Sequence, residues 1–382
     1  MKKQSIETRL VHSGEPRPRI EGAVTLPIFQ SATFEWSGTT DYHEIRYGRL
    51  SNTPNHVALH DKLADIESAE AALVASSGMA AISTSLLTVL SAGDHLLAQN
   101  VLYGGTFDFV TKDLPSWGIE LDLVDGHDPE EWKEKLRPNT RAFYVETISN
   151  PLMTVSNLDE AARFAREHNL LSFIDNTFAS PINFRPAEHG FDLSLHSATK
   201  YLNGHSDLIA GAIIGRREVV DRVKIKLDHL GGSLDPHACF LLNRGLKTLG
   251  LRIAYQNASA QALAEALESF DRVRAVHYSG LPGHRDHQTA SRLLDGFGGM
   301  ISSEIDGSGA EVQERIDRLT IATDAPSLGG PETLVTIPAN TSHAGMTPEE
   351  RKMSGIAGGL IRVSVGLEGT QDLIDDFRQA LS

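Results

Sequence analysis

Cysteine is almost absent from this sequence. Cys239 is the only one in 382 residues, so no disulfide can form within the chain. Long apolar runs are missing too: nowhere do the roughly 18 consecutive apolar residues of a membrane-spanning helix occur, and no apolar stretch follows the first basic residues as in a secretory signal. We therefore expect a cytoplasmic protein without a membrane partner, in which Cys239 is a buried and unreactive thiol.

Positive charge is also scarce. The chain has 35 Lys and Arg against 50 Asp and Glu, a formal net charge of −15, and it has no basic run interleaved with aromatic residues. This balance excludes a typical nucleic-acid surface. The histidines do not suggest a metal site, because the closest cluster, His284 to His287, lacks a pair of ligands spaced i, i+4 on a helix.

The remaining pattern is that of an α/β enzyme. Over residues 51–245, apolar strands alternate with helical patterns, which predicts a mostly parallel sheet covered by helices. The seven expected strands lie near 71–75, 95–99, 119–124, 141–146, 170–174, 191–195 and 209–214. We expect residues 1–50 to form an irregular arm that lies on a neighbouring chain. Residues 246–382 are expected to form a smaller C-terminal α/β domain, with strands near 299–305, 333–337 and 360–365.

Lys200 is the most informative residue. It follows Ser197 and Thr199 just after an expected strand, and ligands of open α/β sheets bind where strands end. Hydroxyls at positions i and i+2 can hold one phosphate, while the lysine amine forms a Schiff base with an aldehyde on the same ligand. This combination indicates pyridoxal phosphate, although a solvated lysine in a Ser/Thr turn is the simpler explanation of Lys200 by itself.

Three other strand ends carry groups that suit the same ligand. Asp175, in the run Asp175-Asn176-Thr177, can keep a pyridinium nitrogen protonated, or it can cap a helix. The backbone amides of Gly78 and Met79 begin a helical stretch and attract anions, although an N-cap at the preceding serine accounts for the same sequence. Tyr103 can stack on a flat ring or simply belong to a turn.

Taken together, these residues resemble the pyridoxal-phosphate enzymes of cysteine and methionine metabolism, which include cystathionine γ-lyase, cystathionine γ-synthase, cystathionine β-lyase and methionine γ-lyase. The resemblance spans nearly the whole chain and is most specific in the run from His196 to Asp207. The other matching segments are Tyr47–Arg49, Ser77–Met79, Tyr103–Gly105, Ser149–Pro151, Asp175–Thr177, Ser327–Gly330 and Leu360–Gly366. The resemblance implies the aspartate-aminotransferase-like fold (fold type I).

The resemblance also implies roles for individual residues. Lys200 would hold the cofactor and move protons, Asp175 would pair with the ring nitrogen, and Tyr103 would stack on the ring and assist catalysis. Cofactor-binding roles would fall further to Gly78, Met79, Thr177, Ser197 and Thr199, and from a neighbouring subunit to Tyr47 and Arg49. Asn150, Ser327 and Arg362 would orient the substrate, with Arg362 binding its α-carboxylate through a two-pronged contact. A homotetramer built from dimers with shared sites is expected.

Two positions depart from the family pattern. The chain reads Asn52-Thr53-Pro54 where many relatives have Asn-Pro-Thr, and proline changes the path of the backbone. Pro326 stands where relatives that act on cystathionine often have glutamate and one branch has tyrosine. Without a carboxylate there, recognition of the distal amino group of cystathionine is in question.

We therefore expect a carbon–sulfur lyase or transferase that acts by γ-elimination or γ-replacement on cystathionine or a related homoserine-derived amino acid. The runs Asn203–Asp207 and Ser342–Met346 favour this branch. A methionine γ-lyase or a cystathionine β-lyase is the alternative within the fold. An aminotransferase and a non-catalytic cofactor-binding scaffold are more distant alternatives.

Overall fold

The computed structural model describes residues 4–341, 344–345, 347, 351 and 357–381. Its larger sheet has seven strands in the order β1-β7-β6-β5-β4-β2-β3. The strands are β1 Ala71–Ala75, β2 His95–Gln99, β3 Glu120–Val124, β4 Thr140–Glu146, β5 Leu171–Asp175, β6 Leu193–Ser197 and β7 Gly211–Gly215. Only β7 runs against its neighbours, so the sheet is mostly parallel, as predicted. The sequence-based bounds agree to within two residues at every strand.

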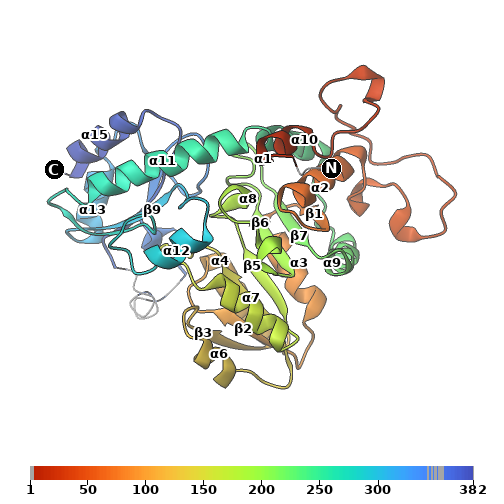
Figure 1. Ribbon diagram of the computed structural model, residues 1–382, viewed down its shortest axis with the longest axis horizontal. Helices are drawn as coiled ribbons and strands as arrows, with labels where there is room; N and C mark the ends of the chain where they lie inside the picture. The colour runs from red at the N-terminus through yellow and green to blue at the C-terminus, as the bar shows by residue number, and fades with distance from the viewer. Residues whose placement is uncertain (1–3, 342–343, 346, 348–350, 352–356, 382) are drawn as a thin grey trace.

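Helices cover both faces of this sheet (Figure 1). One face packs on α2 Pro54–Ile66, α6 Pro129–Glu134, α7 Leu158–Glu167 and α10 Pro236–Leu246, and the other on α3 Gly78–Val89 and α9 Arg217–Leu230. Between β3 and β2 the chain also forms α4 Gly104–Asp108, a π-helical turn over Phe109–Asp113 and α5 Leu114–Ser116. Cys239 lies buried in α10 and its pKa is raised by burial, as expected for an unreactive thiol.

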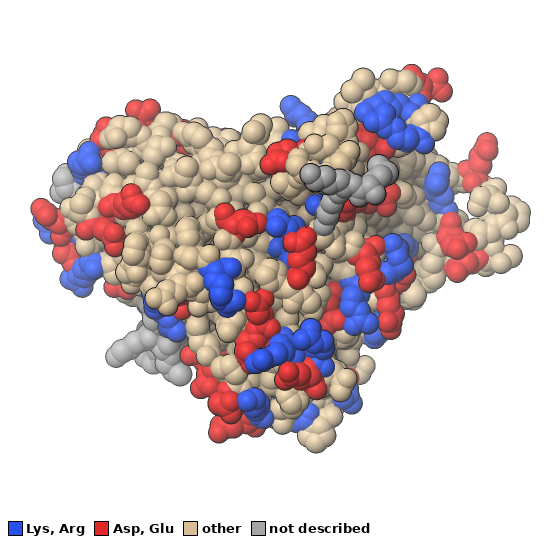
Figure 2. All heavy atoms as spheres, viewed as in Figure 1, with Lys and Arg blue, Asp and Glu red and all other residues tan. Residues whose placement is uncertain are grey.

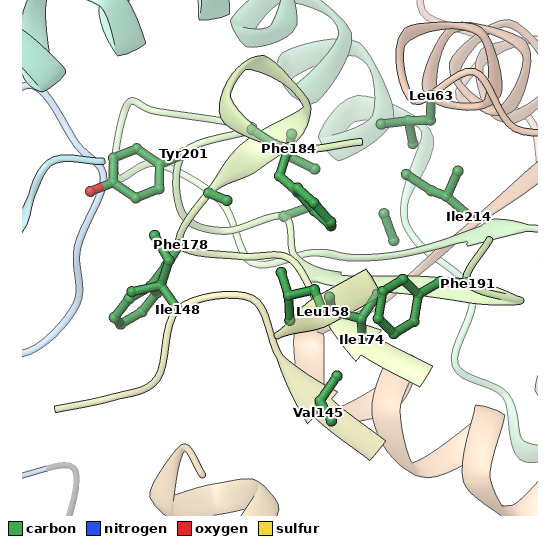
Figure 3. Packing of buried hydrophobic residues seen from close by; sticks show 14 of the residues in the cluster. Leu63, Val145, Ile148, Leu158, Ile174, Phe178, Phe184, Phe191, Tyr201 and Ile214 are labelled. Carbon is green, nitrogen blue, oxygen red and sulfur yellow. The ribbon is translucent and has the colours of Figure 1, made fainter. Parts of the chain in front are cut away.

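The core on the α7 face is continuous with the wall of the cavity described below. Figure 3 shows Val145 and Ile174, from neighbouring strands, packed beside Leu158 at the start of α7. In the same cluster Ile148 and Phe178 lie side by side beyond the strand ends. The short helix α8 Ser180–Asn183 begins two residues after Phe178. Residues that follow β4 and β5 are therefore anchored by the same apolar cluster that holds the strands.

The smaller domain has a five-stranded sheet in the order β10-β11-β12-β9-β8. Its elements are α11 Leu249–Leu267, β8 Val273–His277, α12 His287–Leu293, β9 Met300–Ile305, α13 Gly309–Ile316, β10 Thr323–Asp324, β11 Leu334–Thr336, β12 Leu360–Ser364 and α15 Thr370–Leu381. Strands β8 and β10 were not anticipated from the sequence. Apolar side chains of α11, α13 and α15 cover one face of the sheet. The predicted boundary at residues 245/246 falls at the end of α10 and stays a prediction.

The N-terminal segment is irregular from residue 13 onward but not before it. Ile6–His12 form α1, whose Leu10 is 1% exposed in the core, and this helix was not anticipated. From Ser13 to residue 50 the chain carries short 3-10 turns and an isolated β-bridge between Thr33 and Tyr47, and much of it projects from the body of the molecule (Figure 1). Asn52 fastens the end of this arm, accepting a hydrogen bond from the Tyr47 N–H at 2.9 Å and donating one to the Ile45 carbonyl at 2.8 Å.

Acidic and basic side chains alternate on the face shown in Figure 2, most densely over the end formed by α6 and α7. Ion pairs such as Arg292–Asp159, at 2.7 Å, lie there. Among the described residues, no helix has both the length and the apolarity needed to cross a membrane.

Candidate active site

Three neighbouring parallel strands bring polar side chains to one edge of the large sheet. Side chains alternate between the two faces of a strand, and β4, β5 and β6 all place their last residue, Glu146, Asp175 or Ser197, on the face covered by α3. These residues line a cavity of about 630 Å³. The smaller domain closes its far side with Ser327, Leu328 and other residues, so the cavity lies between the two domains.

Lys200 enters the cavity from the turn after β6. Its Nζ donates a hydrogen bond to Ser327 Oγ at 2.6 Å, across 127 residues of chain. Burial, with a smaller contribution from the positive charge of Arg362, lowers the pKa of the Lys200 amine to about 8. Ser327 has a φ of 103°, a conformation that is strained for residues other than glycine and is typical of functional sites. An amine that is partly neutral near pH 8 is suited to attack an aldehyde or to move a proton.

Asp175 lies in the cavity wall with one oxygen already occupied. Its Oδ1 accepts a hydrogen bond from the Thr177 N–H at 2.9 Å, and the Thr177 hydroxyl accepts one from the Ser197 N–H at 2.9 Å. Burial raises the pKa of Asp175, while Thr177 and the imidazole of His196 act in the opposite direction. Behind the strand, His196 Nε2 lies 2.5 Å from Glu67 Oε1.

The start of α3 forms a cradle next to Ser197. The Ser77 hydroxyl caps the helix by accepting a hydrogen bond from the Ala80 N–H at 3.0 Å, and Gly78 and Met79, the first two residues of the helix, line the cavity. A Cβ added to Gly78 would lie 2.8 Å from the Ser197 Cβ, so only glycine allows the helix to approach the strand so closely. Free amides at the start of a twelve-residue helix, together with the hydroxyls of Ser197 and Thr199, suit a phosphate.

Arg362 faces the cavity because of the alternation along β12. Ile361 and Val363 point into the core of the smaller domain, so Arg362 points toward the larger one. Its Nη1 donates to Asn150 Oδ1 at 3.1 Å and its Nη2 to the Ser327 carbonyl at 3.2 Å. The residue is 4% exposed, and among the described residues its buried Nε has no hydrogen-bond acceptor. A buried guanidinium with a free donor is suited to bind a carboxylate.

Tyr103 stands at the mouth of the cavity at the start of α4. It is 43% exposed, and a Cβ added to Gly105 would lie 2.7 Å from its Cε1, so the glycine lets the ring fold back over the helix start. The structure thus brings together eleven of the predicted residues around one cavity: Gly78, Met79, Tyr103, Asn150, Asp175, Thr177, Ser197, Thr199, Lys200, Ser327 and Arg362.

Tyr47 and Arg49 are not part of this cavity in their own chain. Arg49 donates to the Asp228 carbonyl on α9 at 2.8 Å and also contacts the Tyr42 hydroxyl. Tyr47 is 39% exposed. Contact with the site of a neighbouring subunit therefore stays a prediction for both. Of the predicted run Ser342–Met346, residues 342, 343 and 346 lie outside the described residues.

Several cavity residues were not singled out in the sequence. They are Ile82, Glu146, Ile148, Phe178, Ile209 and Thr341. Glu146 is the most notable, because it is a buried acid at the end of the apolar run Ala142–Val145. Asp175 ends its own strand in the same way, so the signal for Glu146 was present in the sequence.

Comparison with known proteins shows which enzyme family the chain belongs to. The family model described as Cys/Met metabolism PLP-dependent enzyme matches residues 7–382. The chain belongs to this family. It is 40% identical to a cystathionine β-lyase of Lactococcus lactis subsp. cremoris over 99% of both chains. It is 37% identical to an L-methionine γ-lyase of Treponema denticola, over 100% of this chain and 98% of the relative.

A solved structure of cystathionine γ-synthase from Xanthomonas oryzae pv. oryzae, in complex with cystathionine, superposes with a TM-score of 0.94. It is 36% identical and covers 99% of this chain and 98% of that one. The fold class, the membership of the Cys/Met metabolism family, the enzymatic nature of the chain and its dependence on pyridoxal phosphate are thereby confirmed.

The residues of the cavity fit this cofactor. The absence of a Cβ at Gly78 lets the start of α3 approach Ser197 closely. The free Nε of Arg362 offers a donor to a carboxylate, and Lys200 lines the same cavity. The donor set therefore matches a ligand with an aldehyde, a phosphate and a bound amino acid.

Proposed function

We propose that this chain is a trans-sulfuration enzyme that catalyses γ-elimination or γ-replacement on cystathionine or a related homoserine-derived amino acid. The observation that carries the proposal is the arrangement of one cavity: a partly neutral Lys200 amine held by Ser327, with Asp175 on the sheet side and Arg362 on the side of the smaller domain. This arrangement supports both the binding of an amino acid and proton removal from its α-carbon.

Residues of this chain would divide the work as follows. When bound, pyridoxal phosphate supplies a ring that draws electrons from the α-carbon of an amino acid. Asp175 would keep a proton on the ring nitrogen, and Tyr103 would lie against the ring face. Ser197, Thr199 and the amides at the start of α3 would bind the phosphate and fix the position of the ring.

Lys200 would act as the general base and acid. Its amine would take the α-proton and return it at another carbon, and the pKa of about 8 makes both protonation states accessible near neutral pH. Arg362, held by Asn150 and Ser327, would bind the α-carboxylate and set the α-hydrogen toward Lys200. The Tyr103 hydroxyl would assist the departing sulfur group.

A methionine γ-lyase is the second candidate, and one observation favours it. Pro326 stands where some relatives carry a glutamate, and it lines the cavity together with the apolar residues Leu328 and Ile209. A proline has no charge to pair with the distal ammonium group of cystathionine, whereas an alkyl thioether needs no such partner. The β-lyase alternative rests on the similarity to the Lactococcus protein.

Parallel assays with cystathionine, methionine, cysteine and an O-acylhomoserine plus cysteine test the proposal. We expect α-ketobutyrate from γ-elimination or cystathionine from γ-replacement, and loss of both in Lys200→Ala. Pyruvate as the sole keto acid product would assign β-elimination instead, and methanethiol from methionine as the preferred substrate would assign the second candidate. Glutamate formed from 2-oxoglutarate would indicate an aminotransferase.

The proposal includes a homotetramer built from two dimers and a location in the cytoplasm. Support for the assembly comes from the arm, because Tyr47 and Arg49 match the family motif yet lie outside the cavity of their own chain. Light scattering on the purified protein measures the assembly, and cell fractionation tests the location.

A further inference from the structure

Two acidic residues lie side by side in the wall of the cavity. Glu146 and Asp175 are paired in register as the last residues of the neighbouring strands β4 and β5, and both point to the α3 face. Neighbouring strands are about 4.8 Å apart, so the two carboxyl groups are close. Glu146 is only 4% exposed. The proposed chemistry gives Asp175 a role but leaves Glu146 without one.

The contacts of Glu146 connect two parts of the site. Its Oε1 accepts a hydrogen bond from the Tyr103 N–H at 2.7 Å, and the Asn150 N–H lies near enough to stabilise its negative charge. Tyr103 carries the ring that would stack on the cofactor, and Asn150 accepts a hydrogen bond from Arg362. Glu146 is itself fixed, because its own N–H donates to Gln99 Oε1 at 3.2 Å. One side chain thus contacts the backbone of two segments that line the cavity.

Buried carboxylates this close together do not both ionise readily. Asp175 has the better environment for a charge, because the Thr177 N–H and hydroxyl and the imidazole of His196 all favour its anion. Burial and the charge of Asp175 raise the pKa of Glu146 well above its usual range, despite the two backbone N–H groups. Tyr144, on the same strand, carries a phenol that is also kept neutral by burial. The carbonyl oxygen of a neutral acid still accepts the Tyr103 N–H, although more weakly than a carboxylate does.

We propose that Glu146 is a positioning residue that works as a neutral carboxylic acid, holding the backbones of Tyr103 and Asn150 in place while Asp175 remains the one anion of the pair. Its importance for the reaction rests on the proposed function, whereas its effect on the apo-protein and on cofactor affinity does not.

A matched pair of acid-to-amide substitutions tests this role. Glu146→Gln keeps a neutral acceptor of the same shape. We therefore expect the unfolding temperature of the apo-protein to stay within a few degrees of wild type, and both the dissociation constant of pyridoxal phosphate and kcat/KM to stay within about threefold. Asp175→Asn removes the anion and is expected to weaken cofactor binding by about 10-fold or more. Glu146→Ala leaves two N–H groups without an acceptor and should weaken it by about 10- to 100-fold.

The alternatives give different patterns. If Glu146→Gln is as damaging as Glu146→Ala, Glu146 works as an anion and the inference is wrong. A harmless Asp175→Asn beside a harmful Glu146→Gln would reverse the two roles and also overturn it. Wild-type behaviour of Glu146→Ala would show that the side chain positions nothing. Cofactor affinity and apo-protein stability need no substrate, so failure here is distinct from failure of the proposed reaction.

Discussion

At the scale of single residues, the reactivity of the site depends on the charge of Lys200. An exposed lysine is almost fully protonated at pH 8 and a poor nucleophile. Here burial and Arg362 remove part of the preference for the ammonium form, and Ser327 fixes the direction of the amine. Desolvation costs the charged form more than the neutral form, so the fold itself increases the fraction of Lys200 that is neutral.

The pH dependence of cofactor uptake tests whether the pKa of Lys200 is lowered in this way. Only the neutral amine attacks the cofactor aldehyde, and the neutral form dominates above the pKa. The rate of reconstitution of the apo-protein should therefore rise about tenfold per pH unit below pH 8 and level off above it. In Arg362→Gln the levelling should move to higher pH, because a positive charge that lowers the Lys200 pKa is gone. Stopped-flow absorbance measures both profiles, with the exposed Arg378→Gln as control. A rate that still rises steeply through pH 10 would contradict the account.

At the scale of secondary-structure elements, the site depends on where strands and helices begin and end. The ends of β4, β5 and β6 supply Glu146, Asp175 and Ser197, and the first turn of α3 meets the last of these strands. Close approach at that point requires Gly78, because a Cβ at this position would lie 2.8 Å from the Ser197 Cβ.

Gly78→Ala should therefore damage the phosphate cradle specifically. The added methyl group meets the backbone-proximal atoms of Ser197, which cannot move away freely, and overpacking of this kind costs about 1–3 kcal/mol. We expect cofactor affinity to fall by about tenfold or more, measured by fluorescence titration of the apo-protein. Gly283→Ala is the matched control, because nothing lies within 4 Å of the added Cβ. Equal affinities of the two variants for pyridoxal phosphate would refute the proposal that Gly78 is needed for phosphate binding at the start of α3.

Most strands of the large sheet could be predicted because they are buried on both faces and read as short apolar runs, whereas the edge strand β3 is partly exposed and was predicted from the alternation of strands and helices along the chain. Strand β8 escaped prediction since it is an edge strand with partly exposed residues, and β10 has only two residues. Contacts between distant segments were beyond the reach of sequence patterns. The Lys200–Ser327 bond is one example, and the pairing of Glu146 with Asp175 is another, since it depends on which strands are neighbours in the sheet.

At the scale of the whole molecule, the arm is the feature that a single chain does not explain. Much of the segment 13–50 projects from the body (Figure 1), although Glu15, Leu26 and Leu50 are buried. It exposes large apolar side chains, with Val24 at 75% and Trp36 at 73%. Such side chains are expected to be covered by another surface. A neighbouring copy whose cavity receives Tyr47 and Arg49 would cover them.

Mixing two inactive variants tests whether the sites are shared. We expect Arg49→Ala and Lys200→Ala each to lose most activity when expressed separately. Co-expression should restore up to about one quarter of the wild-type rate, because half of the randomly formed dimers are hybrids and each hybrid has one intact site. The specific activity of the co-purified protein is the measurement. If each site were complete within its own chain, the mixture would stay inactive.

The most direct test of the whole account is to find the residue that carries the cofactor. Borohydride reduction of the holoprotein, followed by peptide mass mapping, should place a stable pyridoxyl group on Lys200 and leave the other lysines unmodified. Lys200→Ala should bind pyridoxal phosphate without becoming labelled. A reduced adduct at any other lysine, or none at all in a protein saturated with the cofactor, would contradict the account.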